Sequence, residues 1–106
     1  MKQAQLLFVL IDAAVADILE QADWYAAQSG FALAERWEKE VTSSVLRVVK
    51  NPAVGAPCRF RPAELRNVRR TAIRGFPRHL LFYRTRGSEV LVLRVVHGAP
   101  DLEKLL

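Results

Sequence analysis

The sequence predicts an α+β fold with an N-terminal strand, an antiparallel helical hairpin and then a three-stranded antiparallel sheet. Three observations predict it: an apolar run near the N-terminus, apolar residues at helical spacing over residues 15–49, and alternating strand-like runs from Arg69 to Asp101. Helices that precede a meander of strands are expected to cover one face of its sheet. At 106 residues, 51% of them hydrophobic, the chain is expected to form one domain over residues 1–106.

The first expected element is a strand over Leu6–Ile11, an uninterrupted apolar run typical of a strand buried on both faces or paired inside a sheet. Together with Lys2 the run superficially resembles a secretory signal. Asp12 interrupts it after six apolar residues, and a helical pattern continues beyond, so we expect no export. No stretch of the sequence is long enough to span a membrane.

Two helices are expected next. Asp12 can cap the first, which ends at Ser29-Gly30. Its apolar stripe consists of Val15, Ile18, Leu19, Ala22, Tyr25 and Ala26. The second begins near Phe31 and stops at Asn51-Pro52, because the residue before proline is pushed out of the α region. Its stripe consists of Leu33, Trp37, Val41, Val45 and either Val48 or Val49. The short link between the helices predicts an antiparallel pair.

Gly87-Ser88 predicts a two-residue hairpin turn, since glycine supplies the positive φ that such turns need. The register that follows pairs Arg86 with Glu89, Tyr83 with Val92 and His79 with Val96. One face, expected to meet the core, holds Leu80, Phe82, Leu91, Leu93 and Val95. The other face, expected to be an exposed binding surface, holds His79, Leu81, Tyr83, Thr85, Val90, Val92, Arg94 and Val96.

Positive charge is concentrated in one segment. The chain carries +5 overall, but residues 59–86 hold nine arginines and a single acid, Glu64, which gives that segment +8. Arginine suits bidentate recognition of carboxylates and phosphates, so the implied partner is a nucleic acid or an acidic protein segment. The alternative is a solvated basic edge that only opposes aggregation.

Several kinds of site have no signature in the sequence. There is no phosphate-binding glycine loop, no paired zinc-ligand spacing and no nucleophile elbow, and neither histidine is spaced to form a metal site with Cys58. We therefore expect no metal and no cofactor. The single cysteine cannot form an internal disulfide, which favours a reducing, cytoplasmic compartment, and Cys58 itself is interpreted as structural or incidental.

General acid–base cleavage of RNA is the enzymatic alternative. His79 or Tyr83 could move the protons, and Arg70, Arg74 or Arg94 could stabilise charge on the phosphate. Any arginine-rich antiparallel sheet offers such a set, and His97 at a strand end is also typical of a structural histidine.

Six segments in order resemble the RelE/ParE toxin superfamily, with the ParE branch closest. They are Ala16-Asp17-Ile18-Leu19 with Trp24-Tyr25, Asn51-Pro52 with Gly55, Leu65-Arg66, Arg74-Gly75-Phe76, His79-Leu80-Leu81-Phe82-Tyr83-Arg84 and Leu93-Arg94-Val95-Val96-His97-Gly98. The resemblance covers nearly the whole chain and implies a RelE/ParE-like fold. It also implies a cytoplasmic toxin of a type II toxin-antitoxin system that causes growth arrest and forms a hetero-oligomer with a cognate ParD-like antitoxin.

ParE-like relatives poison DNA gyrase, whereas RelE-like relatives cleave messenger RNA on the ribosome with basic residues and a tyrosine. This sequence departs from the nuclease pattern: Pro100 stands where relatives often carry arginine, no lysine lies between Asn51 and Glu103, and a C-terminal tyrosine is missing. The resemblance therefore favours gyrase inhibition over the ribonuclease alternative, and a non-toxic basic binding domain is the third possibility. The residues expected to bind target or antitoxin are Arg66, Arg69, Arg70, Arg74, Arg78, Tyr83, Arg84, Arg94 and His97.

Overall fold

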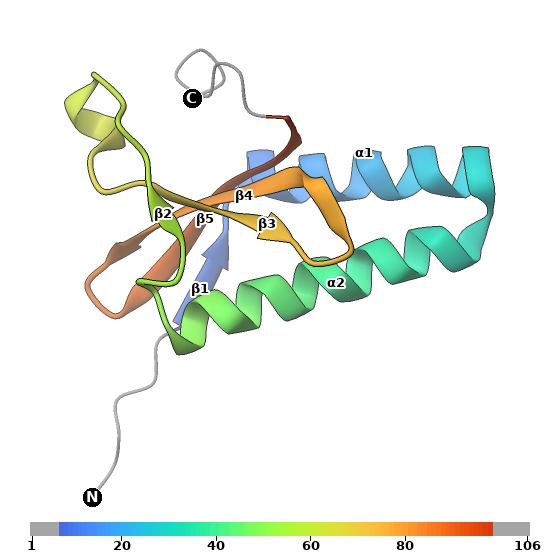
Figure 1. Ribbon diagram of the computed structural model, residues 1–106, viewed down its shortest axis with the longest axis horizontal. Coiled ribbons are helices and arrows are strands. Elements are labelled where there is room, and N and C mark those ends of the chain that lie inside the picture. Colours follow the sequence, from blue (N-terminus) through green and yellow to red (C-terminus); the bar gives the residue numbers. More distant parts are fainter. Residues whose placement is uncertain (1–6, 99–106) are drawn as a thin grey trace, which may run out of the picture.

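A helical hairpin packs on one face of a five-stranded sheet (Figure 1). The computed structural model describes residues 7–98. Its helices are α1 (Asp12–Ser29) and α2 (Phe31–Lys50), and a single 3-10 turn, η1, spans Ala63–Leu65. Its strands are β1 (Leu7–Leu10), β2 (Ala56–Pro57), β3 (Arg69–Ile73), β4 (Phe76–Arg86) and β5 (Glu89–His97).

The sheet is mixed, with strand order β1-β5-β4-β3-β2. The predicted antiparallel meander is present as β3, β4 and β5, but the prediction of a three-stranded sheet was incomplete. β1 pairs with β5 in parallel, and β2 adds two residues beside β3. A two-residue strand that includes Pro57 carries no periodic signal, which is why the sequence did not reveal it.

β1 lies at the edge of the sheet. It is paired within the sheet, as one of the two expectations had it, but the alternative of burial on both faces was wrong. Leu7 and Phe8 are 64% and 45% exposed. A continuous apolar run does not distinguish a strand buried on both faces from an edge strand with exposed apolar side chains. Leu6, the first residue of the predicted strand, lies outside the described residues.

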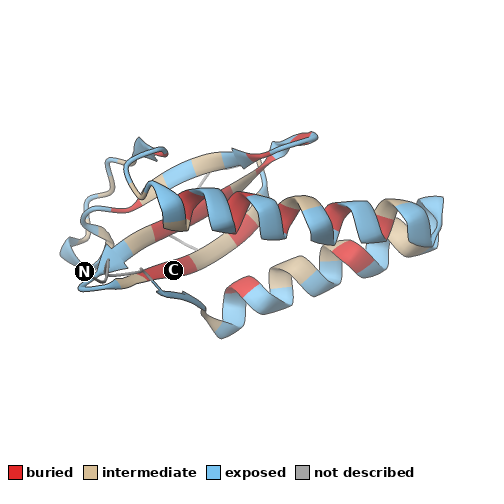
Figure 2. Cartoon of the chain, turned by 90° about the horizontal axis from the view of Figure 1, so that it is seen from below, coloured by how far each residue is buried: buried red, intermediate tan, exposed pale blue. Residues whose placement is uncertain are grey.

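Both helices end where the sequence predicts. The apolar stripe of α2 packs against the sheet (Figure 2). Trp37, Val41, Val45 and Val48 are buried there. α1 packs mainly against α2 and β5, so it buries a narrower stripe and leaves Val15 and Leu19 exposed. Asp12 is the first residue of α1 and forms no capping hydrogen bond; Ile11 occupies the N-cap position.

The predicted β4–β5 register is correct from Arg86 to Tyr83 and wrong beyond it. A bulge between Phe82 and Tyr83 shifts the pairing by one residue, so that His79 faces His97 instead of Val96. Because side chains alternate along a strand, a bulge also changes which residues face the helices.

The predicted assignment of the two sheet faces was also wrong. The core beneath the helices contains Leu81, Tyr83, Val90, Val92 and Val95, most of which had been assigned to the binding face. Phe82, which had been assigned to the core, packs in a second cluster with Val68. Both faces are apolar, so alternation separates them without showing which one meets the helices.

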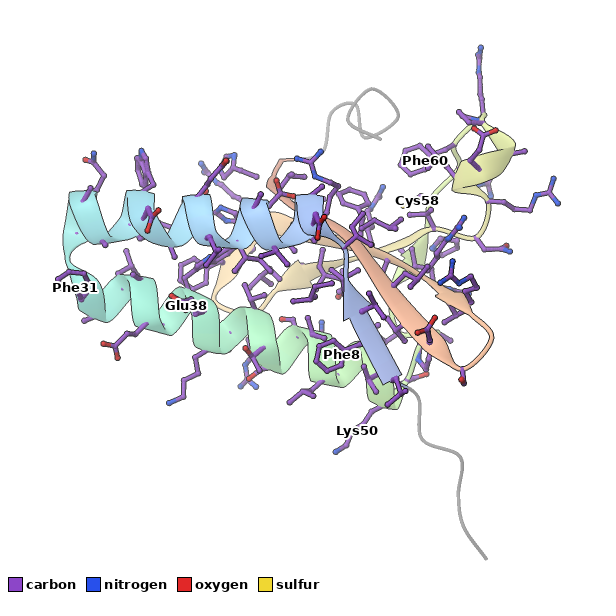
Figure 3. The ribbon with its side chains drawn as sticks, turned by 180° about the vertical axis from the view of Figure 1, so that it is seen from behind. Phe8, Phe31, Glu38, Lys50, Cys58 and Phe60 are labelled. Carbon is purple, nitrogen blue, oxygen red and sulfur yellow. The ribbon has the colours of Figure 1, made fainter. Side chains whose placement is uncertain are left out.

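The second face of the sheet is partly covered by the segment from Cys58 to Val68, which includes η1. Cys58, Phe60 and Leu65 pack against the cluster of Val68 and Phe82. Cys58 and Phe60 are labelled in Figure 3. The expectation of an exposed second face is therefore only partly correct, because this segment packs against it. Among residues 7–98, no helix is both long and apolar enough to cross a membrane.

Candidate functional site

Tyr83, a candidate for both docking and proton transfer, is completely buried. Its hydroxyl donates a hydrogen bond to the carbonyl oxygen of Pro52 and accepts one from the amide of Gly55, both at 2.8 Å. Burial raises the pKa of the Tyr83 phenol, which opposes its use as a base. The side chain fastens the loop after α2 to the sheet, and no surface is left for an RNA phosphate to contact.

His79, the other proton-transfer candidate, is only 4% exposed. Its ring centroid lies 4.6 Å from that of Trp37 and 5.0 Å from that of His97. Burial and, to a lesser extent, the charge of His97 lower the pKa of His79, so the neutral form is favoured. His97 is exposed at the end of β5.

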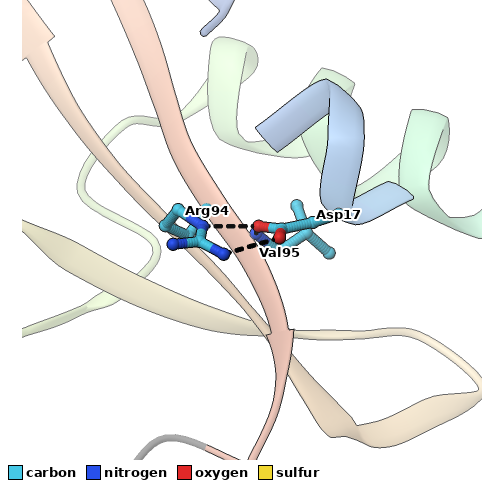
Figure 4. A network of polar contacts seen from close by, with 3 residues as sticks. All are labelled: Asp17, Arg94 and Val95. Carbon is cyan, nitrogen blue, oxygen red and sulfur yellow. Dashed lines mark hydrogen bonds and ion pairs between the residues drawn. The ribbon is translucent and has the colours of Figure 1, made fainter. Parts of the chain in front are cut away.

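Arg94 is held by Asp17 in a bidentate pair that joins β5 to α1 (Figure 4). Its Nε and Nη2 atoms lie 2.7 Å from the two carboxylate oxygens, and the amide of Val95 donates to the same carboxylate at 3.0 Å. The hydrogen bonds that Arg94 donates to the Asp17 carboxylate raise the pKa of Arg94. No sequence pattern indicates this pair, because its members are 77 residues apart.

Arg69 and Arg84 donate hydrogen bonds to backbone carbonyl oxygens of the loops. Arg69 donates to the carbonyl oxygen of Gly55 at 2.7 Å, and Arg84 donates to that of Glu64 at 2.6 Å. Both were expected to bind a partner, and both have donors committed to the fold. Arg70 lies exposed on β3. Burial raises the pKa of the Cys58 thiol, and the nearby Arg70 guanidinium opposes this rise only in part.

The five candidate nuclease residues are therefore not assembled into one open site. Tyr83 and His79 are buried, and Arg94 is paired with Asp17. Arg70 lies within β3 and Arg74 follows its end, and both are exposed. Neither of the two proton-transfer candidates, His79 and Tyr83, is therefore an accessible proton acceptor beside these cations.

Arg59, Arg66, Arg74 and Arg78 are exposed, and none of them makes an ion pair with a carboxylate in the described part of the chain. They form two groups at opposite ends of β3 (Figure 1). We call Arg59 and Arg66, which flank η1, the η1 arginines, and Arg74 and Arg78, at the β3–β4 turn, the turn arginines. The predicted single basic surface is thus divided, and Arg59 is a member that the prediction omitted.

An exposed apolar surface on β1 and α1 was not predicted. Leu7, Phe8 and Val9 are exposed on the edge strand, and Val15 and Leu19 are exposed on α1. The spacing of these apolar residues suggested that they are buried. The spacing does not show that α1 contacts only part of the sheet, which is why Val15 and Leu19 remain exposed.

A groove of about 730 Å³ lies between α1, the start of β4 and the end of β5. Trp24 and Tyr25 come from α1, while Phe76, His79 and His97 come from the strands. Within residues 7–98, no three histidine, cysteine or carboxylate side chains are placed together to hold a metal ion.

Comparison with known proteins identifies the family. The family model for the ParE toxin of the type II toxin-antitoxin system parDE matches residues 9–102. The solved structure of a chromosomal ParDE toxin-antitoxin system from P. aeruginosa superposes with a TM-score of 0.73 at 21% identity, covering 91% of this chain and 99% of that one. No curated protein matches the sequence. Since the family model spans nearly the whole chain, this protein belongs to the ParE toxin family.

Proposed function

We propose that this protein is a toxin that inhibits DNA gyrase and is neutralised by a cognate ParD-like antitoxin. The observation that carries the proposal is the match of the ParE toxin model over residues 9–102. The site of action would be the cytoplasm, where gyrase works and where a single thiol such as Cys58 stays reduced.

The geometry supports binding to a protein over cleavage of RNA. A ribonuclease centre needs an accessible proton acceptor and donor close to cationic groups. Here the Tyr83 hydroxyl is used by Pro52 and Gly55, and His79 is packed among aromatic rings. Free guanidinium groups and exposed apolar side chains, by contrast, are what a protein interface uses.

Two kinds of surface support an antitoxin partner and a hetero-oligomer. The exposed apolar residues of β1 and α1 would be covered by an antitoxin helix or strand, since such segments dock by burying an apolar face or extending a sheet edge. An acidic stretch of the same partner would pair with the η1 arginines or the turn arginines. Arg74 and Arg78 are our candidates to contact gyrase, since both are exposed and, like the η1 arginines, have no carboxylate partner in the described residues.

A supercoiling assay with purified gyrase tests the proposal. Addition of the toxin should reduce supercoiling or cause cleaved DNA to accumulate. Mixing the toxin with its antitoxin beforehand should prevent this loss of gyrase activity. Replacement of both turn arginines by alanine should weaken inhibition. Replacement of Lys39 and Lys50, two exposed cations of α2, removes the same charge and should leave inhibition unchanged.

Unaltered supercoiling at an excess of folded toxin would overturn the gyrase proposal. Loss of full-length transcripts soon after induction, with gyrase unaffected, would instead favour the ribonuclease function. Equal losses of inhibition in the arginine and lysine variants would show that only net charge matters.

A further inference from the structure

The groove beside α1 has a helix wall that is acidic and aromatic. α1 carries four carboxylates, Asp12, Asp17, Glu20 and Asp23, and no lysine or arginine. Asp17 forms the bidentate pair with Arg94, and Glu20 interacts more weakly with the same guanidinium, so Glu20 is the carboxylate of the groove without an ion pair among the described residues. The helix wall therefore favours a positively charged ligand.

Trp24 supplies an open aromatic face next to that carboxylate. It is 56% exposed, and its indole N–H makes no hydrogen bond with the described residues. Glu20 lies one helical turn earlier, so the two side chains are neighbours on one helix face. Tyr25 contacts the Trp24 ring edge-on with centroids 5.6 Å apart, which restricts its orientation.

A second, independent feature is His79 at the base of the groove. The side chain is buried to 96%, and its Nε2 atom has no hydrogen-bond partner among the described residues. An unsatisfied polar atom buried in an aromatic setting costs free energy, so it indicates a missing donor or acceptor. A neutral imidazole nitrogen can accept a hydrogen bond from a ligand once the surrounding rings adjust.

The strand wall has the opposite charge. Arg78 lines the groove there and would repel a cation, so a cationic group is directed toward Glu20 and Trp24. The guanidinium donors of Arg78 suit the carbonyl oxygens of a bound peptide. Apolar groups between the two walls, from Tyr25 and Val96, suit an aliphatic side-chain stem.

From these observations we propose that the groove binds a protein segment through one arginine or lysine, held by the Glu20 carboxylate and the Trp24 ring. A cation over an indole face, with a carboxylate beside it, gains both a cation–π contact and an ion pair. The groove shares Arg78 with the turn arginines, but the proposed cation site is built on Glu20 and Trp24 of α1, and peptide binding to it is measured without gyrase.

Short peptides test the proposal on the full chain. The probe is acetyl-Val-Arg-Val-amide, compared with the same peptide carrying glutamine or glutamate at the centre. Titration followed by NMR should give shifts confined to the groove, including the Trp24 indole N–H, for the arginine peptide. Trp24→Ala and Glu20→Gln should each weaken binding by about three- to tenfold. Glu35→Gln, an exposed glutamate of α2, is the matched control and should bind as the wild type does.

Each other outcome would overturn the proposal. If the glutamine peptide bound as tightly as the arginine peptide, the groove would recognise only the apolar groups of the peptide. Tighter binding of the glutamate peptide would show that Arg78 decides its preference. Absence of groove shifts with the arginine peptide, or an undiminished affinity in folded Trp24→Ala and Glu20→Gln proteins, would exclude this site. Because Glu20 and Trp24 are exposed, both variants are expected to keep the fold, which circular dichroism can verify.

Discussion

The hydroxyl of Tyr83 occupies the space that a side chain at Gly55 would need. A Cβ atom at position 55 would lie 2.5 Å from the Tyr83 oxygen and 2.8 Å from the carbonyl oxygen of Arg70. Position 55 therefore requires glycine, because the sheet closely approaches the loop after α2 there. The contact joins two segments 28 residues apart.

Tyr83→Phe should lower the free energy of unfolding by about 1–3 kcal/mol, because it leaves the buried amide of Gly55 without an acceptor. Urea denaturation measures the change. Tyr25→Phe removes a hydroxyl that has no hydrogen-bond partner among the described residues, and it should change stability by less than about 0.5 kcal/mol. Equal effects of the two variants would show that the Tyr83 hydrogen bonds contribute little.

Gly55→Ala should destabilise the protein by about 1–3 kcal/mol through overpacking. Combining it with Tyr83→Phe should cost less than the sum of the single changes, because the phenylalanine removes the nearest clashing atom. Unfolding of the four proteins in urea gives this coupling. Strict additivity would mean that the clash with the Arg70 carbonyl oxygen decides the cost.

The sequence predicted the helices and the β4–β5 hairpin well because their signals are local. Gly30 and Asn51-Pro52 mark helix ends, and Gly87 marks a turn, whatever the rest of the chain does. The face of the sheet that meets α2 depends on a bulge at Phe82 and on packing between distant elements, so periodicity could not reveal it.

The candidate site was predictable only as a concentration of charge. Counting arginines could not show that Arg94 binds Asp17, or that Arg69 and Arg84 bind loop carbonyls, because each of these contacts joins residues remote in sequence. The exposed arginines at the two ends of β3 became distinguishable only when those contacts were known. Pro100, which weighed against nuclease activity, lies outside the described residues.

The pair of Asp17 and Arg94 should contribute far more to stability than the surface pair of Arg86 and Glu89. Their side chains are 10% and 17% exposed, so Asp17→Ala leaves a desolvated guanidinium and should cost about 2–3 kcal/mol. The Arg86 side chain is 68% exposed and lies 3.3 Å from the Glu89 carboxylate. Arg86→Ala should therefore lower the free energy of unfolding by less than about 0.5 kcal/mol. Thermal or urea unfolding compares them, and similar losses would contradict this ranking.

Stability should fall as the solution becomes mildly acidic because of His79. Burial lowers the pKa of this histidine in the folded protein, so the unfolded chain binds the proton more readily. The contribution is fully present above the unfolded pKa, about 6.5, and is lost as the pH falls from there through the lower folded value. The slope that one histidine can add is at most about 1.4 kcal/mol per pH unit.

Urea unfolding between pH 8 and 5 measures this dependence in a range above the ordinary carboxylate pKa values. His79→Leu should flatten the profile, because the buried titrating group is gone. His97→Gln should retain most of the slope, since burial is the larger cause of the His79 shift and the charge of His97 the smaller one. A profile for His79→Leu as steep as that of the wild type would assign the acid sensitivity to other groups, and the packing of His79 against Trp37 would then have no part in it.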